Sequence, residues 1–120
     1  MAHILLVDDE ESVRGLLKRG LELDQHTVEL GIDGADALEI LREQNGTFDL
    51  MVSDIRMPEM DGIALAHAAK NEFPHIRILL MTGYAEQRER AKELETVVED
   101  VLSKPFALGD LRSAVKKILS

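Results

Sequence analysis

The sequence predicts an α/β fold, a three-layer (βα)5 domain with one doubly wound parallel sheet and helices on both faces. Short apolar runs alternate with helix-forming segments along the whole chain. The runs are continuous rather than alternating, which is typical of strands covered on both faces. Strict alternation of strand and helix favours a parallel sheet with right-handed crossovers.

In the first half of the chain, strands are expected at residues 3–7, 27–30 and 50–54. A helix begins at Ser12, because apolar residues then repeat with the spacing of one helix face. These residues are Val13, Leu16, Leu17 and Leu21. A second helix begins at residues 33–34, and Asn45-Gly46 ends it. Its predicted apolar face holds Ala35, Leu38 and Leu41.

In the second half, an alanine-rich helix is expected at residues 63–73, where Pro74 stops it. Strands are expected at residues 77–82 and within 97–103. Between them, residues 85–95 have helical propensity but weak amphipathic character, so little burial holds that helix in place. The last helix has an apolar face made by Leu108, Leu111, Val115 and Ile118.

The composition limits the classes of function. For a chain of 120 residues, we expect one domain, residues 1–120, and no output domain beside it. It has no cysteine, which excludes disulfides and cysteine metal sites. No apolar run approaches the roughly 20 residues that cross a bilayer, and no signal peptide is apparent, so a cytoplasmic protein is expected. A formal charge of −9 without a basic stripe argues against direct nucleic-acid binding.

Three acidic side chains mark the carboxyl ends of two predicted strands. Asp8 and Asp9 follow the first strand, and Asp54 ends the third. Asp8 or Asp9 alone would more often be part of a solvated helix start, but this edge of an open α/β sheet is where such folds place their chemistry. Two carboxylates about 4 Å apart repel by roughly 4 kcal/mol at an effective dielectric of 20, so the cluster favours a cation. Oxygen ligands without His or Cys suit Mg²⁺, with Mn²⁺ also possible.

Asp54 is the candidate nucleophile, because carboxylates form aspartyl-phosphates and this one ends the central strand. Thr82 ends the fourth strand, and Lys104 follows the fifth. The hydroxyl can bond one phosphoryl oxygen, and the ammonium can pair with another. Thr82 alone could be a helix cap and Lys104 alone a surface lysine. Together at one edge of the sheet, these residues predict a phosphoryl-transfer site.

Over its whole length, the chain resembles the receiver domains of two-component response regulators. The matching motifs are Asp8-Asp9, Asp54 with the following loop Ile55-Arg56-Met57-Pro58-Glu59-Met60-Asp61-Gly62, Thr82-Gly83, and Lys104-Pro105-Phe106. The resemblance implies a flavodoxin-like sheet with strand order 2-1-3-4-5. It implies that a histidine kinase or a histidine phosphotransferase phosphorylates Asp54.

The resemblance also implies a ligand set. Mg²⁺ would be held by Asp9, Asp54 and the backbone carbonyl of Arg56, with Asp8 assisting. Thr82 and Lys104 would then bind the phosphoryl group, and the surface of residues 85–120 would pass the message to a downstream protein.

One position departs from the family pattern. Receivers commonly carry Tyr or Phe three residues before the lysine, whereas this chain has Val101. A β-branched aliphatic side chain has no large inward and outward rotamers to choose between. Tyr84, the only tyrosine, lies two residues after Thr82. We hypothesise that Tyr84 and Arg56 control water access and so the lifetime of the phosphoryl group.

One alternative to a phosphorylation-controlled switch remains, and two others are disfavoured. The sequence Met81-Thr82-Gly83-Tyr84-Ala85 and the missing aromatic resemble CpdR-type cell-cycle receivers of alphaproteobacteria. That likeness implies an adaptor that delivers substrates to the ClpXP protease when unphosphorylated. A dehalogenase-type phosphatase needs an acid two residues after the nucleophile. This chain has Arg56 there, which could not act as a general acid, so this alternative is disfavoured. A dinucleotide enzyme is excluded more firmly, because no glycine-rich turn follows the first strand.

Overall fold

The computed structural model describes residues 1–94 and 96–120, and within them five strands form a single parallel sheet. The strands lie in the order β2-β1-β3-β4-β5, so the predicted fold class and strand order are confirmed. Their bounds are β1 His3–Val7, β2 Thr27–Gly31, β3 Leu50–Asp54, β4 Arg77–Thr82 and β5 Asp100–Ser103. β1 and β3 are neighbours, which brings their carboxyl ends to one edge of the sheet.

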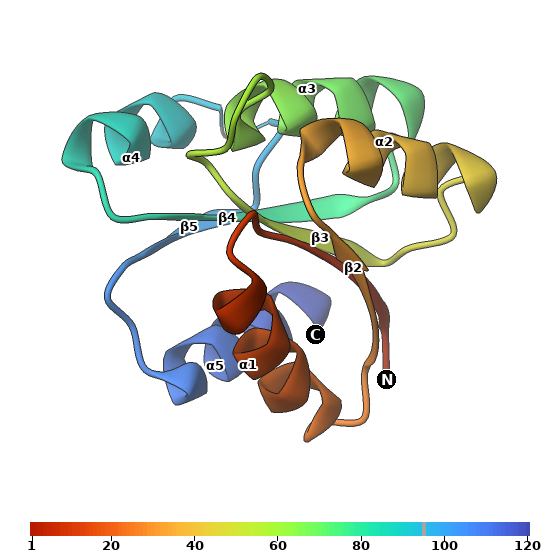
Figure 1. Ribbon diagram of the computed structural model, residues 1–120, viewed down its shortest axis with the longest axis vertical. Helices are drawn as coiled ribbons and strands as arrows, with labels where there is room; N and C mark the ends of the chain where they lie inside the picture. The colour runs from red at the N-terminus through yellow and green to blue at the C-terminus, as the bar shows by residue number, and fades with distance from the viewer. Residues whose placement is uncertain (95) are drawn as a thin grey trace.

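Five helices in the described residues cover the sheet on both faces. They are α1 Glu11–Glu22, α2 Gly34–Glu43, α3 Gly62–Glu72, α4 Ala85–Lys92 and α5 Leu108–Leu119. Helices α1 and α5 lie on one face, and α2, α3 and α4 lie on the other (Figure 1). None of these helices is long and apolar enough to span a bilayer. Helix α4 ends at Lys92, so the helix predicted over residues 85–95 is too long; its predicted last residue, Glu95, lies outside the described residues.

Side chains of each strand alternate between two apolar layers. On β1, Ile4 and Leu6 belong to the layer under α1 and α5, whereas Leu5 and Val7 belong to the layer under α2 and α3. Burial on both faces explains why the strand sequence is apolar throughout. All of β3 is buried, so Asp54 ends a strand that is fixed in place on every side.

Two predicted apolar faces are partly wrong. Leu16 is 59 % exposed, because α1 packs through Leu17, Gly20 and Leu21 instead. A Cβ at Gly20 would lie 2.4 Å from Leu108 Cδ1, so this glycine lets α1 and α5 approach closely, and Leu16 lies outside the buried face. In α2, Ala37 rather than Ala35 is buried with Leu38 and Leu41. The expectation for α4 is confirmed, since it buries only Ala91.

The loop between β3 and α3 folds tightly against the end of β3. Gly62 N–H donates to the Ile55 carbonyl at 2.7 Å. A Cβ on Gly62 would lie 2.2 Å from the Asp54 carbonyl oxygen, so only glycine allows this approach. Asp61 caps α3 by accepting a hydrogen bond from Ala64 N–H at 2.8 Å. The loop therefore fixes the backbone on the carboxyl side of Asp54.

Candidate functional site

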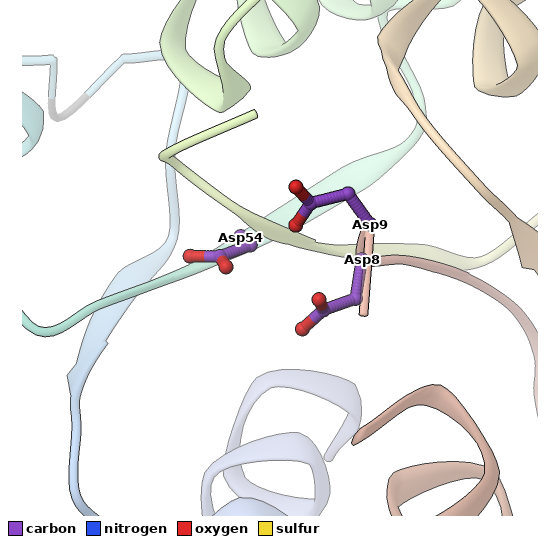
Figure 2. A group of neighbouring side chains, drawn as sticks. All are labelled: Asp8, Asp9 and Asp54. Atoms are coloured by element: carbon purple, nitrogen blue, oxygen red, sulfur yellow. The ribbon is translucent and has the colours of Figure 1, made fainter. Parts of the chain in front are cut away.

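Three carboxylates converge at the carboxyl edge of the sheet. Asp8 and Asp9 follow β1, and Asp54 ends the neighbouring strand β3. Each offers a carboxylate oxygen, and these oxygens all lie within 4.8 Å of one another. Figure 2 shows the side chains of Asp8 and Asp9 extending toward the side on which Asp54 lies. The structure thus brings Asp54 next to the Asp8-Asp9 pair, from which it is distant in the sequence.

Asp8 is the most deeply buried member of this acidic cluster, with no exposed surface. Its Oδ1 accepts a hydrogen bond from Glu10 N–H at 2.9 Å. Its Oδ2 is buried and has no hydrogen-bond partner among the described residues. Burial raises the pKa of Asp8, and the charge of the neighbouring Asp54 raises it further. An orphaned, buried carboxylate oxygen beside two other acids fits a divalent cation with oxygen ligands.

Lys104 supplies the positive charge of the site. Its Nζ lies 3.1 Å from Asp54 Oδ2 and 3.8 Å from Asp8 Oδ2. Burial acts to lower the pKa of Lys104, but the hydrogen bond to Asp54 and the charges of both acids outweigh it, so the pKa is raised. The lysine is therefore held as an ammonium. The peptide bond from Lys104 to Pro105 is cis.

Thr82 is 2 % exposed, and its hydroxyl is engaged within the segment that joins β4 to α4. The hydroxyl donates to Gln87 Oε1 at 2.8 Å and accepts from Tyr84 N–H at 3.1 Å. Gln87 was not singled out by sequence reasoning. An amide in the first turn of a highly polar helix gives no periodic signal that would distinguish it from its neighbours.

Arg56 and Tyr84, the two residues that we expect to control water access, lie side by side. The Arg56 guanidinium donates to the Tyr84 hydroxyl, and its central carbon lies 5.0 Å from the centre of the ring. Both side chains line a pocket of about 850 Å³, whose wall also includes Asp54 and Lys104. Because Asp54 is 7 % exposed, this pocket is its route to solvent.

Val101 occupies the position where receivers commonly have an aromatic residue. It pairs with Leu80 across β4 and β5, is 8 % exposed, and packs in the layer under α3 and α4. The side chain is a fixed part of the core. No aromatic ring stands at this position to move between a buried and an exposed state.

These groups define what the site can do. A carboxylate with access to a pocket can act as a nucleophile, and the ammonium beside it can neutralise an incoming anion. The acidic oxygens can hold a hard divalent cation. The acidic cluster and Lys104 lie together at the carboxyl edge of a flavodoxin-like sheet.

A family model described as the response regulator receiver domain matches residues 4–116, so the chain belongs to this family. Such domains serve two-component signalling. Among curated relatives, the sensor kinase CckA of Brucella abortus is 38 % identical over 98 % of the chain, which spans 12 % of that protein. The response regulator MprA of Mycobacterium ulcerans is 35 % identical over 98 % of the chain, which spans 50 % of that protein.

A solved structure agrees with this assignment. The response regulator TrrA from Thermotoga maritima, in complex with Mg²⁺-BeF, has a TM-score of 0.85 and 31 % identity, covering 99 % of this chain and 100 % of its own. The family and the fold are therefore established. The roles of the individual site residues stay predictions.

Proposed function

We propose that the chain is a phosphoacceptor of a two-component or phosphorelay system in which Asp54 carries the phosphoryl group. The observation that carries this proposal is the environment of Asp54. Its carboxylate opens to a pocket, lies 3.1 Å from an ammonium, and shares its surroundings with two further acids. Phosphorylation adds about −1.5 to −2 charges at this point and shifts the equilibrium between conformations that bind different partners.

The phosphodonor in this proposal is a phosphohistidine of a histidine kinase or histidine phosphotransferase. A carboxylate oxygen of Asp54 attacks phosphorus, the P–N bond breaks, and its electron pair returns to the imidazole ring. Lys104 is already within reach of Asp54, so it can pair with a phosphoryl oxygen. The likeness to part of the sensor kinase CckA supports this kind of partner. The chain assists only its own phosphorylation and dephosphorylation.

The residues present fit a magnesium ion, for which Mn²⁺ is an alternative. Asp8, Asp9 and Asp54 are the candidate side-chain ligands, and the backbone carbonyl of Arg56 is the fourth proposed ligand. The orphaned Oδ2 of Asp8 and the mutual repulsion of the acids support this choice. When bound, such an ion neutralises charge on the phosphoryl oxygens. The complex of TrrA with Mg²⁺-BeF supports the same assignment.

Arg56 and Tyr84 are proposed to set the lifetime of the phosphoryl group. Their stacked side chains line the same pocket as Asp54. Hydrolysis requires a water to reach the phosphorus through that pocket, so a paired cover on its wall lengthens the lifetime.

The test of the proposed function is intact mass after incubation with a small phosphodonor, with and without Mg²⁺. The wild-type chain should gain about 80 Da, the mass of one phosphoryl group, only when Mg²⁺ is present. Asp54→Asn should gain nothing. Asp49→Asn is the matched control, because Asp49 directly precedes β3 and so lies at the end of that strand away from Asp54. This variant should behave as wild type. A wild-type chain that never gains this mass would overturn the proposal.

The second candidate is an adaptor whose unmodified form binds its partner, with ClpXP as the partner that the CpdR-type likeness suggests. Val101 favours it, because a fixed aliphatic side chain gives no aromatic readout of phosphorylation. The surface of residues 85–120 is the proposed contact in both cases. Capture of partners on immobilised Asp54→Ala separates the two: an adaptor keeps its partner, whereas an activated switch loses it.

A further inference from the structure

The hydroxyl of Thr82 has one proton, and that proton already forms a hydrogen bond. It is donated to Gln87 Oε1 at 2.8 Å, and the oxygen in turn accepts from Tyr84 N–H at 3.1 Å. A threonine hydroxyl has a single donor, so Thr82 cannot donate to Gln87 and to a phosphoryl oxygen at the same time. The two bonds exclude one another.

The position of Gln87 links the hydrogen bond of Thr82 to the attachment of α4. It lies in the first turn of α4, a helix whose only buried residue is Ala91. Few apolar contacts hold such a helix, so a side-chain hydrogen bond from its first turn to the end of β4 adds to its attachment. The segment between Thr82 and α4 also borders a pocket of about 210 Å³ lined by Ser103 and Lys104, which gives it room to move.

We infer that Gln87 is a positioning residue that holds the Thr82 hydroxyl away from Asp54 in the unmodified chain and releases it on phosphorylation. This inference rests on the proposed function of Asp54. Gln87 then does, through a hydrogen bond, what Val101 cannot do through a rotamer change: it ties the state of the acidic site to the position of α4. Release of Thr82 frees the first turn of α4 from β4.

The bond to Gln87 must be broken before Thr82 can bind the phosphoryl group, so it opposes phosphorylation. Gln87→Leu keeps a side chain of similar size in the helix but removes the acceptor. Gln87→Glu keeps an acceptor, and a carboxylate can only accept, so the Thr82 bond persists and becomes charge-assisted. The two variants should therefore change the site in opposite directions.

The experiment measures the affinity of the full chain for beryllofluoride, a mimic of the phosphoryl group, by calorimetry in the presence of Mg²⁺. Removal of one neutral hydrogen bond that competes with binding should raise the affinity of Gln87→Leu about fivefold. Gln87→Glu should bind at or below the wild-type affinity. Glu86→Leu, in the same turn of α4, is the matched control and should leave the affinity unchanged.

A double-mutant cycle separates the hydrogen bond from a general loosening of α4. In a Thr82→Ala background the competing proton is gone, so Gln87→Leu should no longer raise the affinity. Hydrogen exchange gives a second readout without any ligand: amides of the first turn of α4 should exchange faster in Gln87→Leu and at the wild-type rate in Gln87→Glu.

The outcomes distinguish the two proposals. If the wild-type chain binds no beryllofluoride and gains no phosphoryl group, the proposed function fails and this inference falls with it. Only the role of Gln87 is overturned if the wild type binds beryllofluoride and Gln87→Leu does not bind it more tightly. The same holds if Gln87→Leu raises the affinity as much in the Thr82→Ala background as in the wild type.

Discussion

Lys104 Nζ lies between two carboxylates, 3.1 Å from Asp54 Oδ2 and 3.8 Å from Asp8 Oδ2. One ammonium thus offsets two of the three acids that meet at the end of β1 and β3. Its Nζ is also within reach of the carboxylate that we propose to be phosphorylated. The same side chain therefore pairs with the acids of the unmodified domain and, in the proposed function, pairs with the phosphoryl group.

Lys104→Met should weaken both properties. The Lys104 side chain is 29 % exposed, so loss of its ion pair with Asp54 should lower the free energy of unfolding by only about 1–2 kcal/mol. Mg²⁺ should restore part of this loss, because it neutralises the acids that Lys104 leaves behind. Urea unfolding with and without Mg²⁺ measures both effects. Lys117→Met, at an exposed site on α5, should show neither, and equal losses in the two variants would contradict the prediction.

Asp8→Asn should stabilise the domain at neutral pH when Mg²⁺ is absent. Because burial raises the pKa of Asp8 in the folded state, the native chain binds its proton more tightly than the unfolded chain does. That contribution to stability is present at low pH and is lost as the pH rises through the folded-state pKa. Replacing the ionised group removes a buried carboxylate whose Oδ2 accepts no hydrogen bond from the described residues, and such an acceptor costs about 1–3 kcal/mol.

Thermal unfolding across pH tests the sign of this effect. The advantage of Asp8→Asn should shrink as the pH falls toward 3.8, the ordinary value for an aspartate, where the wild-type carboxyl is protonated. Mg²⁺ should raise the melting temperature of the wild type more than that of the variant. A variant that is less stable than wild type at pH 7, or equally stabilised by Mg²⁺, would count against the assignment of Asp8 to the cation site.

Gly62→Ala and Gly15→Ala form a matched pair of substitutions. A Cβ at Gly62 would meet the Asp54 carbonyl oxygen at 2.2 Å, whereas a Cβ at Gly15 would meet nothing within 4 Å. The first should destabilise the domain by about 1–3 kcal/mol and move Asp54. The second lies in the exposed interior of α1 and should stabilise it by about 0.5–1 kcal/mol.

Denaturant midpoints and phosphoryl gain together test this pair. Gly62→Ala should lower both the midpoint and the rate of phosphorylation, because the loop fixes the end of β3. Gly15→Ala should raise the midpoint and leave the rate unchanged. Normal phosphorylation in Gly62→Ala would show that the β3–α3 loop does not position Asp54.

The acidic cluster could be predicted from the sequence, whereas the contacts around it could not. Asp8 and Asp54 each follow a continuous apolar strand, and parallel strands share one carboxyl edge, so their convergence follows from topology alone. The buried face of α1 includes Gly20, where α1 meets Leu108 of α5, and this is a contact between helices that are distant in the sequence. Periodicity within one helix holds no information about it.

Gln87 shows the same limit at the site itself. Its partner, Thr82, is only five residues away, yet a polar helix such as α4 offers many side chains of similar chemistry. The bond depends on how the chain turns between β4 and α4. Residue type and spacing do not determine that turn, so the hydrogen bond had to be found in the structure.

Arg56 and Tyr84 should act as one unit on the lifetime of the phosphoryl group. Their contact combines a hydrogen bond with stacking of the guanidinium on the ring, so loss of either partner removes the whole cover of the pocket. Arg56→Ala and Tyr84→Ala should each shorten the lifetime, and the double variant should shorten it no further. Tyr84→Phe keeps the ring and should lie between wild type and Tyr84→Ala. Decay of the phosphorylated mass gives the lifetime, with Lys92→Ala at the far end of α4 as the control. Effects that simply multiply in the double variant would mean that the two side chains act separately, and unchanged lifetimes would remove both from the control of hydrolysis.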